Sequence, residues 1–391
     1  MENFEISNLG PIGHVSVEFG DMTILVGPQA SGKSLFLETL KLIIDRKHII
    51  STLEKYGYFI GQKNVDRLLG VYYGDGMLNV WKEETVVRYD GCDYNRSSLT
   101  KNLQHEEDDE RLFYIPAQRI LGLPDGRLKN FMEFDNTSPY VLRSFTENLR
   151  LFVQHGMGNN SKMLFPIKTR LKGFTRQAFD ENIFHTGQVV VEERMGQRSM
   201  FLHVDDMSLP FMSWSAGQKE FMPLLLGFYC VSGPPNRVVN KEKFKFVVVE
   251  EPEMGLHPRA IVSVILQLLE LVQNGFKVVV STHSPVFLEF AWAFHTLCGN
   301  RESRDRALCE IFHISRPDSP VAQMLSGIFD KTIRTYFFHQ LPEKGGKVES
   351  ADISTLNVFD NSDFVATWGG LSAFSSHVSD VISRNVIDSE A

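Results

Sequence analysis

The sequence predicts an α/β protein with a largely parallel central sheet, and three observations carry this prediction. The apolar run 23–26 is followed by the glycine-containing loop 27–34 and then by a segment with helical spacing. Two further runs, 246–249 and 277–281, are apolar without alternation, as expected for strands buried on both faces of a parallel sheet. Between these runs, apolar residues recur at helical spacing over 261–272, which predicts a strand–helix–strand unit.

The loop at 27–34 matches the phosphate-binding pattern G-x-x-x-x-G-K-[ST] and lies between a predicted strand and a predicted helix. Its glycines let the backbone wrap closely around phosphate oxygens, and the helix N-terminus adds partial positive charge. Lys33 is expected to reach the β- and γ-phosphates of ATP, and Ser34 to ligate Mg²⁺. The predicted nucleotide contacts in this region are Gly27, Pro28, Gln29, Ala30, Ser31, Gly32, Lys33, Ser34 and Leu35.

Other segments predict a smaller antiparallel part and an inserted helical part. Short apolar runs separated by turn residues over 68–95 predict antiparallel strands at 69–73, 77–81 and 85–89. Residues 120–185 are predicted to be mostly helical, with a helix beginning at Ser138-Pro139. Further strands are expected near 4–7, 15–19 and 113–115, a hairpin over 188–204 around Met195-Gly196, and a helix over 221–231.

Acidic and histidine side chains follow the two buried runs. Glu250 and Glu251 come at the end of the first run, and His283 follows the second. Ligands of open parallel sheets bind at the carboxyl ends of the strands. We therefore assign Glu250 to Mg²⁺, Glu251 to the general base that activates water, and His283 to sensing the γ-phosphate or bracing the water.

Two weaker signals complete the predicted site. Gln118 and Arg119 follow the short strand near 113–115, where Gln118 is expected to bridge metal and water, and Arg119 to contact phosphate or a partner subunit. Ser215 stands at the start of a long apolar helix, with the amides of Ala216 and Gly217 beside it. Because the chain already has one phosphate-binding loop, this second anion-binding element is expected to serve the nucleotide of another chain.

Composition excludes several classes of protein. The chain has 391 residues, an apolar share of 43% and a formal net charge of −8. No apolar run is long enough for a membrane span, and the N-terminus does not resemble a signal peptide. The four cysteines lack C-x-x-C spacing, which favours reduced thiols in the cytoplasm and no zinc site. The densest basic stretch, 168–176, is a solvated surface segment or a contact for nucleic acid or an acidic partner.

Taken in order, these motifs resemble those of the ABC-type ATPase heads. The loop 27–34 corresponds to Walker A, Gln118 to the Q-loop, the run 247–251 to Walker B and His283 to the switch histidine. The form Glu-Glu-Pro-Glu followed by Leu-His-Pro over 250–258 resembles the stand-alone heads related to the overcoming-lysogenisation-defect, SMC and RecF proteins, and defence-system AAA-type ATPases. The residues that match the signature motif are Ser215, Ala216, Gly217 and Gln218.

The resemblance implies two heads that dimerise head-to-tail around two ATP molecules, with Mg²⁺, and separate after hydrolysis. Each ATP is then held by Lys33 and Ser34 of one chain and Ser215 of the other. Ala216 stands where transporters commonly have glycine, and Gln29-Ala30 where Asn-Gly is usual, so turnover is expected to be slow. The same motifs predict a P-loop NTPase core of ABC type with an antiparallel β subdomain and an inserted helical lobe.

The motif order divides the chain into four predicted parts. Residues 1–119 form an N-terminal ATPase lobe and 120–186 a helical insert. Residues 187–315 form a C-terminal ATPase lobe, and 316–391 an extension whose segment 367–371 is expected to pack back on the head.

Three interpretations of what the ATP switch drives remain. The first is the ATPase sensor of a prokaryotic antiviral defence or toxin–antitoxin pair with a separately encoded effector, since no Asp-x-Asp nuclease pair follows His283. The second is a DNA-repair ATPase like RecF or the SMC heads, which the negative net charge and the missing heptad array disfavour. The third is an ATP-dependent protein scaffold, and a transporter subunit is the least favoured. Self-association as a dimer or higher oligomer is expected throughout, and a membrane partner is not.

Overall fold

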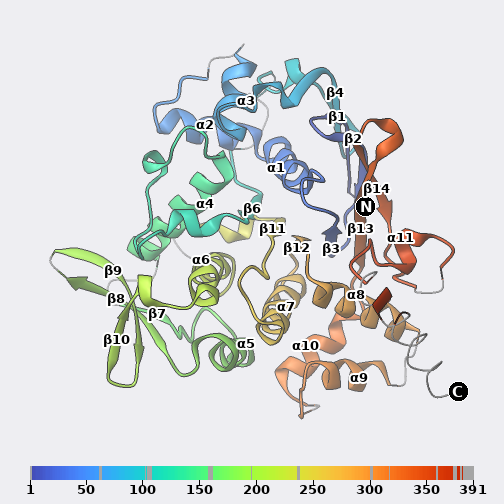
Figure 1. Cartoon of the computed structure of the whole chain (residues 1–391). Coiled ribbons are helices and arrows are strands. Elements are labelled where there is room, and N and C mark those ends of the chain that lie inside the picture. Colours follow the sequence, from blue (N-terminus) through green and yellow to red (C-terminus); the bar gives the residue numbers. More distant parts are fainter. Residues whose placement is uncertain are drawn as a thin grey trace, which may run out of the picture.

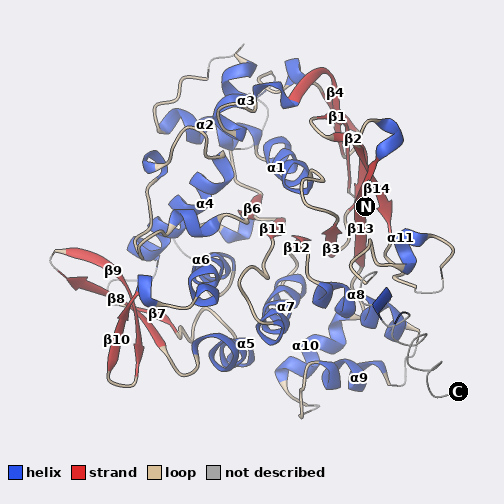
Figure 2. Cartoon of the chain, viewed as in Figure 1, coloured by secondary structure: helices blue, strands red, loops and turns tan. Residues whose placement is uncertain are grey.

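The computed structural model describes residues 2–60, 64–101, 103, 108–156, 162–194, 196–235, 238–299, 303–316, 318–357, 360–372, 377–378 and 381. Met195, in the predicted hairpin turn, lies outside them. Within the described residues, a large mixed sheet and a smaller antiparallel sheet are surrounded by helices (Figures 1 and 2). The helices are α1 (Lys33–Ile44), α2 (Arg46–Lys55), α3 (Val65–Tyr73), α4 (Tyr140–Leu151), α5 (Gly173–Phe179), α6 (Ala216–Val231), α7 (Pro258–Gln273), α8 (Pro285–Cys298), α9 (Arg304–Ile311), α10 (Pro320–Ile328) and α11 (Asp363–Ala366).

The large sheet joins strands from both ends of the chain. The described part of this sheet has ten strands, in the order β5-β4-β1-β2-β14-β13-β3-β12-β11-β6. The strands β13, β3, β12, β11 and β6 run parallel to one another. In sheet order, the bounds are β5 (Cys92–Tyr94), β4 (Trp81–Tyr89), β1 (Asn3–Leu9), β2 (Ile12–Glu18), β14 (Lys347–Asp352), β13 (Ile333–Leu341), β3 (Met22–Val26), β12 (Lys277–Ser281), β11 (Phe246–Glu250) and β6 (Leu112–Ile115).

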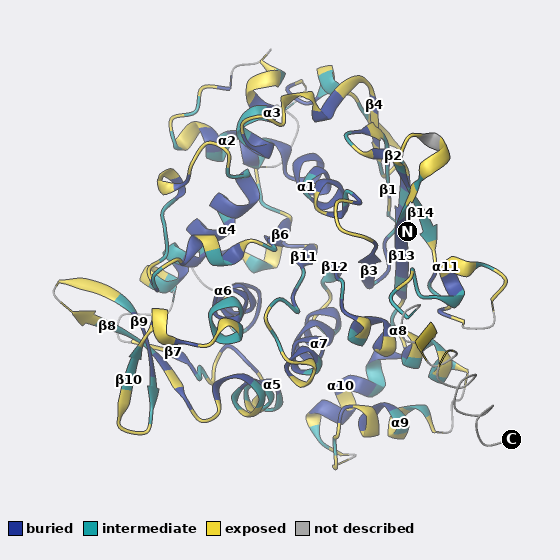
Figure 3. Cartoon of the chain, viewed as in Figure 1, coloured by how far each residue is buried: buried dark blue, intermediate teal, exposed yellow. Residues whose placement is uncertain are grey.

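The parallel strands are buried on both faces, as their lack of alternation predicts (Figure 3). Along β11, Val247 and Val249 join the core under α6 and α7, whereas Phe246 and Val248 join the core under α1. In Figure 1, α1 lies on one side of the central strands and α7 on the other. Helices on both faces of the parallel part of the sheet, with a phosphate-binding loop between β3 and α1, confirm the predicted P-loop α/β core.

The smaller sheet is antiparallel, in the order β10-β9-β8-β7. It contains the predicted hairpin, in which Val190 pairs with Phe201. The structure describes no helix long and apolar enough to cross a membrane. The strands of this sheet are β7 (Met163–Phe165), β8 (Gln188–Arg194), β9 (Gln197–Val204) and β10 (Met207–Pro210).

Two strands predicted within 68–95 were wrong: residues 69–73 are the second half of α3, and residues 78–80 of the run 77–81 form a short 3-10 helix before β4. The side chain of Asn64 caps α3 by accepting a hydrogen bond from the Arg67 amide at 3.1 Å. Buried Leu68, Leu69, Tyr72 and Tyr73 then recur at helical spacing. The aromatic pair suggested a strand by propensity, but the buried face of the helix decides the local structure.

The final segment, 316–391, enters the sheet rather than lying only outside it. β13 pairs with β3, and β14 pairs with β2, so two late strands separate two early ones. Further along, the predicted packing of 367–371 is confirmed, because Trp368 contacts the main core and its Nε1 donates to the Leu356 carbonyl at 2.9 Å. The division of the chain into four domains stays a prediction.

Glu147 on α4 fixes the loop that precedes this helix. Its carboxylate accepts hydrogen bonds from the Phe131 amide at 3.1 Å, the Tyr56 hydroxyl at 2.9 Å and the Arg150 guanidinium at 2.6 Å. Burial alone raises the pKa of Glu147, but the bonds from Arg150 and Tyr56 outweigh it and hold the pKa below its ordinary value. The ionised carboxylate is therefore the form that the fold stabilises.

Replacing Glu147 by Gln is expected to lower the free energy of unfolding by roughly 2 kcal/mol at pH 7, because bonds to a charged group are lost. A carboxylate with a lowered folded-state pKa stabilises the protein above its unfolded pKa, and this contribution disappears as the pH falls through the folded value. The difference between the two proteins should thus shrink on acidification, in urea titrations at pH 7 and pH 4. Glu54→Gln, at an exposed position on α2, is the control; an unchanged difference at both pH values would contradict the assignment.

Candidate functional site

The phosphate-binding loop closes around the Lys33 ammonium. Its Nζ donates to the Gly27 carbonyl at 2.8 Å, to the Pro28 carbonyl at 2.9 Å and to the Ser31 hydroxyl at 3.3 Å. Burial lowers the pKa of Lys33 to about 8, against the opposing charges of Glu251, Glu250 and Glu253. The loop thus brings one desolvated cation to the carboxyl end of β3.

Close backbone approach explains Gly27. A Cβ at this position would lie 2.4 Å from the Phe338 carbonyl oxygen of β13, so no larger residue fits. Ala30 has a φ of 58°, in the left-handed region that a non-glycine residue seldom adopts. The loop keeps its wrapped conformation at Ala30 although glycine is usual there, at a cost in strain of about 1 to 3 kcal/mol.

Glu250 ends β11 and is buried, at 3% exposure. Its Oε2 accepts a hydrogen bond from the Ala117 amide at 3.2 Å, while Oε1 has no partner among the described residues. Burial raises the pKa of Glu250, and the nearby Ser34 hydroxyl acts in the opposite direction. A buried carboxylate oxygen without a partner, close to a serine hydroxyl, is the oxygen donor set that suits Mg²⁺.

Glu251 and His283 face each other at the ends of β11 and β12. Glu251 Oε1 lies 3.6 Å from His283 Nε2, and each side chain is about one-third exposed, at 33% and 31%. The φ of Glu251 is 41°, and its amide donates to the Ser281 carbonyl at 2.8 Å. The backbone therefore turns sharply between the two adjacent glutamates, so that one is buried and the other is accessible.

Burial lowers the pKa of His283, and the positive charge of Lys33 lowers it further, against the opposing charge of Glu251. Lys33, Glu251 and His283 thus influence one another electrostatically, although they come from three different segments. The structure brings together the predicted Walker A, Walker B and switch residues at one edge of the sheet.

Sequence reasoning assigned no role to Glu253. Its Oε1 accepts hydrogen bonds from the Thr282 hydroxyl at 2.7 Å and from the His283 amide at 2.6 Å. Burial raises the pKa of Glu253, and these two bonds oppose the shift. Glu253 ties the loop after β11 to the loop after β12 and positions His283. Its place in the Glu-Glu-Pro-Glu run was the available signal.

The predicted contact of Arg119 with phosphate or a partner is wrong. This side chain is buried, at 1% exposure, and donates to backbone carbonyls inside the chain. Its partners are the carbonyls of Glu250 at 3.0 Å, Glu251 at 3.2 Å, Pro116 at 3.3 Å and Glu220 at 3.3 Å. Arg119 therefore joins the Q-loop, helix α6 and the Walker B segment from within.

Gln118 lies between Ala117, whose amide contacts Glu250, and Arg119. Its side chain is exposed, and no hydrogen bond to it is found in the described part of the chain. The structure places Gln118 beside the acidic pair, and its role as a bridge between metal and water stays a prediction.

The signature residues form the N-terminus of α6. Ser215 caps the helix: its hydroxyl accepts from the Gln218 amide at 3.3 Å, and Gln218 Oε1 accepts from the Ser215 amide at 3.2 Å. Ser215 and Ala216 are exposed, and a Cβ at Gly217 would lie 2.7 Å from the Gly255 carbonyl oxygen. Among the described residues, no hydrogen bond or ion pair joins this cap to the phosphate-binding loop, so the two anion-binding elements are separate.

Comparison with known proteins defines the class. Residues 76–289, more than half of the chain, match the family described as AAA domain, putative AbiEii toxin, Type IV TA system. The chain belongs to this family, which confirms the resemblance to AAA-type ATPase heads. The matched range includes Gln118, Ser215, Glu250 and His283 and begins after the phosphate-binding loop. No curated protein matches the chain.

Solved structures that resemble the chain are heads and cassettes at low identity. An SMC head bound to the C-terminal winged-helix domain of ScpA is 12% identical, with 90% of this chain and 96% of that chain covered and a TM-score of 0.41. An SMC head domain from Thermotoga maritima is 13% identical over 73% and 90%, with a TM-score of 0.35. A dimeric bacterial ABC transporter cassette is 13% identical over 72% and 88%, with a TM-score of 0.31.

Replacing Arg119 by Met is expected to lower the free energy of unfolding by roughly 3 to 5 kcal/mol, because buried carbonyls lose their donor. The matched control is Arg127→Met, which removes an exposed ion pair with Asp125 and should cost about 1 kcal/mol or less. Urea denaturation measures both variants. Equal losses would contradict the internal role of Arg119.

Proposed function

We propose that this protein is an ATP-binding and ATP-hydrolysing switch that works as a dimer. The observation that carries the proposal is the pair of adjacent glutamates, Glu250 and Glu251. One is buried with an unpartnered oxygen beside Ser34, and the other is accessible and 3.6 Å from His283. Hydrolysis of a phosphoanhydride needs these two functions, a metal ligand and a base for water, at separate positions.

Each residue of the cluster has a defined task in this proposal. Lys33 contributes its charge to the β- and γ-phosphates, and the amides of the loop orient them. Ser34 and Glu250 hold Mg²⁺, which when bound neutralises charge on the phosphate oxygens. Glu251 takes a proton from the attacking water, and His283, held by Glu253, fixes the water and the γ-phosphate.

The dimer follows from the position of Ser215. It lies exposed at the N-terminus of a 16-residue helix, where backbone amides and the helix dipole favour an anion. Since no described contact links it to the phosphate-binding loop of its own chain, we assign it to the γ-phosphate held by a second copy. ATP then joins two chains, and hydrolysis releases them.

The biological setting that we propose is the ATPase component of a prokaryotic toxin–antitoxin or antiviral defence pair. The name of the matched family, putative AbiEii toxin of a type IV system, supports this setting. The effector in this proposal is a separate protein.

Glu251→Gln is expected to lower the rate of ATP hydrolysis by at least about a hundredfold, because the amide cannot take a proton from water. ATP binding should persist, and the variant should accumulate as a dimer in ATP, measured by light scattering. Lys33→Ala is the matched variant and should lose ATP binding and remain monomeric. A Glu251→Gln protein that stays monomeric with bound ATP would contradict the dimer model. Undiminished hydrolysis in this variant would exclude Glu251 as the general base.

The proposed setting predicts a phenotype that depends on ATP. Co-expression of this chain with the protein encoded beside its gene is expected to arrest growth of the host or protect it from phage. Lys33→Ala should abolish the effect, whereas Lys55→Ala, at an exposed lysine on α2, should leave it intact. Growth curves and plaque counts measure the outcome. If growth arrest or protection is equally strong with Lys33→Ala, the effect does not depend on nucleotide binding, which contradicts the proposal.

A further inference from the structure

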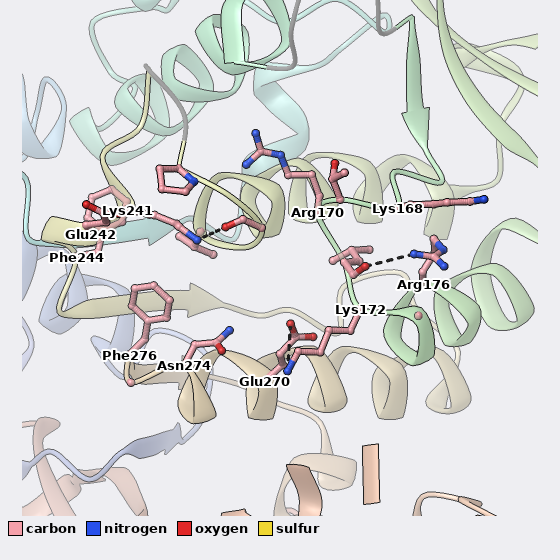
Figure 4. Close-up of a pocket in the computed structure, with 17 residues that line it drawn as sticks. Lys168, Arg170, Lys172, Arg176, Lys241, Glu242, Phe244, Glu270, Asn274 and Phe276 are labelled. Atoms are coloured by element: carbon pink, nitrogen blue, oxygen red, sulfur yellow. Dashed lines mark hydrogen bonds and ion pairs between the residues drawn. The ribbon is translucent and has the colours of Figure 1, made fainter. Parts of the chain in front are cut away.

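A cavity of about 890 Å³ lies at the amino ends of β11 and β12, the opposite end of these strands from Glu250 and Ser281. Its walls come from the segment 168–173, from the loop that precedes β11 and from the end of α7 (Figure 4). Strands of five residues separate it from the catalytic edge by roughly 16 Å. The volume falls within the range of sites for small organic ligands, about 300 to 1,000 Å³.

Positive charge dominates this cavity. Five cationic side chains line it against two acidic ones, and the protein as a whole carries a net charge of −8. Within the described lining, the one ion pair joins Lys172 to Glu270 at 4.0 Å. The cationic residues are Lys168, Arg170, Lys172, Arg176 and Lys241, and the acidic residues are Glu242 and Glu270.

Two of these cations, the buried Arg170 and the half-buried Lys241, form no ion pair with a described carboxylate. The buried Arg170 guanidinium donates to the carbonyls of Pro234 at 2.9 Å, Gly156 at 3.2 Å and Ser232 at 3.3 Å. Lys241 Nζ donates to the Gly233 carbonyl. Burial lowers the pKa of Lys241, and the charge of Arg170 lowers it further, against the opposing charge of Glu242. Neutral carbonyls satisfy the hydrogen bonds but not the charge, so the cavity keeps a positive potential.

The other groups in the cavity suit a planar ring. Figure 4 shows Phe276 and Asn274 at the end of α7, on the same side as Lys241, whereas Lys168 and Arg176 come from the opposite wall. An aromatic ring offers a stacking surface, and an amide side chain both donates and accepts hydrogen bonds. A ligand that carries both a phosphate group and a heteroaromatic ring therefore matches the positive charge and the stacking surface of this cavity.

We propose that this cavity is a second nucleotide-binding site, distinct from the phosphate-binding loop. A phosphate group binds at the wall that carries Lys168 and Lys172, and the base lies against Phe276 and Asn274 on the opposite side. A free nucleotide and a nucleotide within a single strand share this chemistry. Arg170 belongs to the scaffold, because its donors are already used by backbone carbonyls.

The proposal goes beyond the ATP switch and does not depend on it. Helix α7 connects the two regions, since it begins five residues after Glu253 and carries Glu270 into the cavity. A ligand in the cavity therefore contacts the same helix that begins just after the catalytic acids.

Calorimetry with adenosine monophosphate on the full-length chain tests the site, because this nucleotide lacks the β- and γ-phosphates that Lys33 would hold. Binding should be unchanged in Lys33→Ala and at least about tenfold weaker in Lys168→Gln/Lys172→Gln, which loses two charge-assisted contacts. The matched control, Lys55→Gln/Lys101→Gln, removes the same charge from exposed lysines elsewhere and should bind as the wild type does. Circular dichroism and urea midpoints confirm that each variant is folded.

A fluorescein-labelled single-stranded pentanucleotide, followed by anisotropy, distinguishes the two sources. If adenosine monophosphate binds and its binding is weakened only in Lys168→Gln/Lys172→Gln, the ligand is a free nucleotide. If only the pentanucleotide binds, with the same loss in that variant, the ligand is a nucleotide within a strand. Phe276→Leu should weaken the nucleotide several-fold and leave inorganic pyrophosphate unaffected. The proposal is overturned if the wild type binds neither probe at millimolar concentration, if Lys33→Ala abolishes binding of adenosine monophosphate, or if the control double variant loses as much as the cavity variant.

Discussion

The parallel register of β3, β12, β11 and β6 is the constraint on which the rest of the structure depends. Because these strands are apolar on both faces, they must be covered by helices on both sides, and their polar residues can only appear at the ends. The carboxyl ends then meet at one edge, where Lys33, Glu251 and His283 influence one another. Hydrophobic burial thus determines where the polar chemistry of this protein is located.

Buried polar contacts hold the residues at that edge of the sheet in place. Arg119 donates to carbonyls of the Walker B segment and of α6, and Glu253 binds the loop that carries His283. Such desolvated groups are costly to leave unpaired, so each holds its neighbours in a single arrangement. A movement of α6 relative to the acidic pair has to break or carry along the bonds of Arg119. The chain therefore couples its exposed signature cap to the acidic pair through backbone carbonyls rather than through side-chain pairs.

Much of this was predictable from the sequence where local patterns are strong. Unbroken apolar runs identified β3, β11 and β12, and the loop pattern identified the strand–loop–helix unit, because both depend on neighbours in sequence. The strand predicted at 69–73 was wrong because aromatic residues favour strands on average, while their burial here follows a helical face. Apart from the local Pro116 carbonyl, the partners of Arg119 belong to Glu220, Glu250 and Glu251, between 101 and 132 residues away in sequence, which no local pattern encodes.

The position of β13 and β14 between β3 and β2 has a consequence for biosynthesis. The first strands of the chain cannot close their sheet until residues near 350 have left the ribosome, since both facing edges belong to late strands. Until then β2 and β3 present unpaired amides and carbonyls, the kind of edge that recruits other chains. A nascent chain of this protein therefore exposes these two strand edges until β13 and β14 have been synthesised.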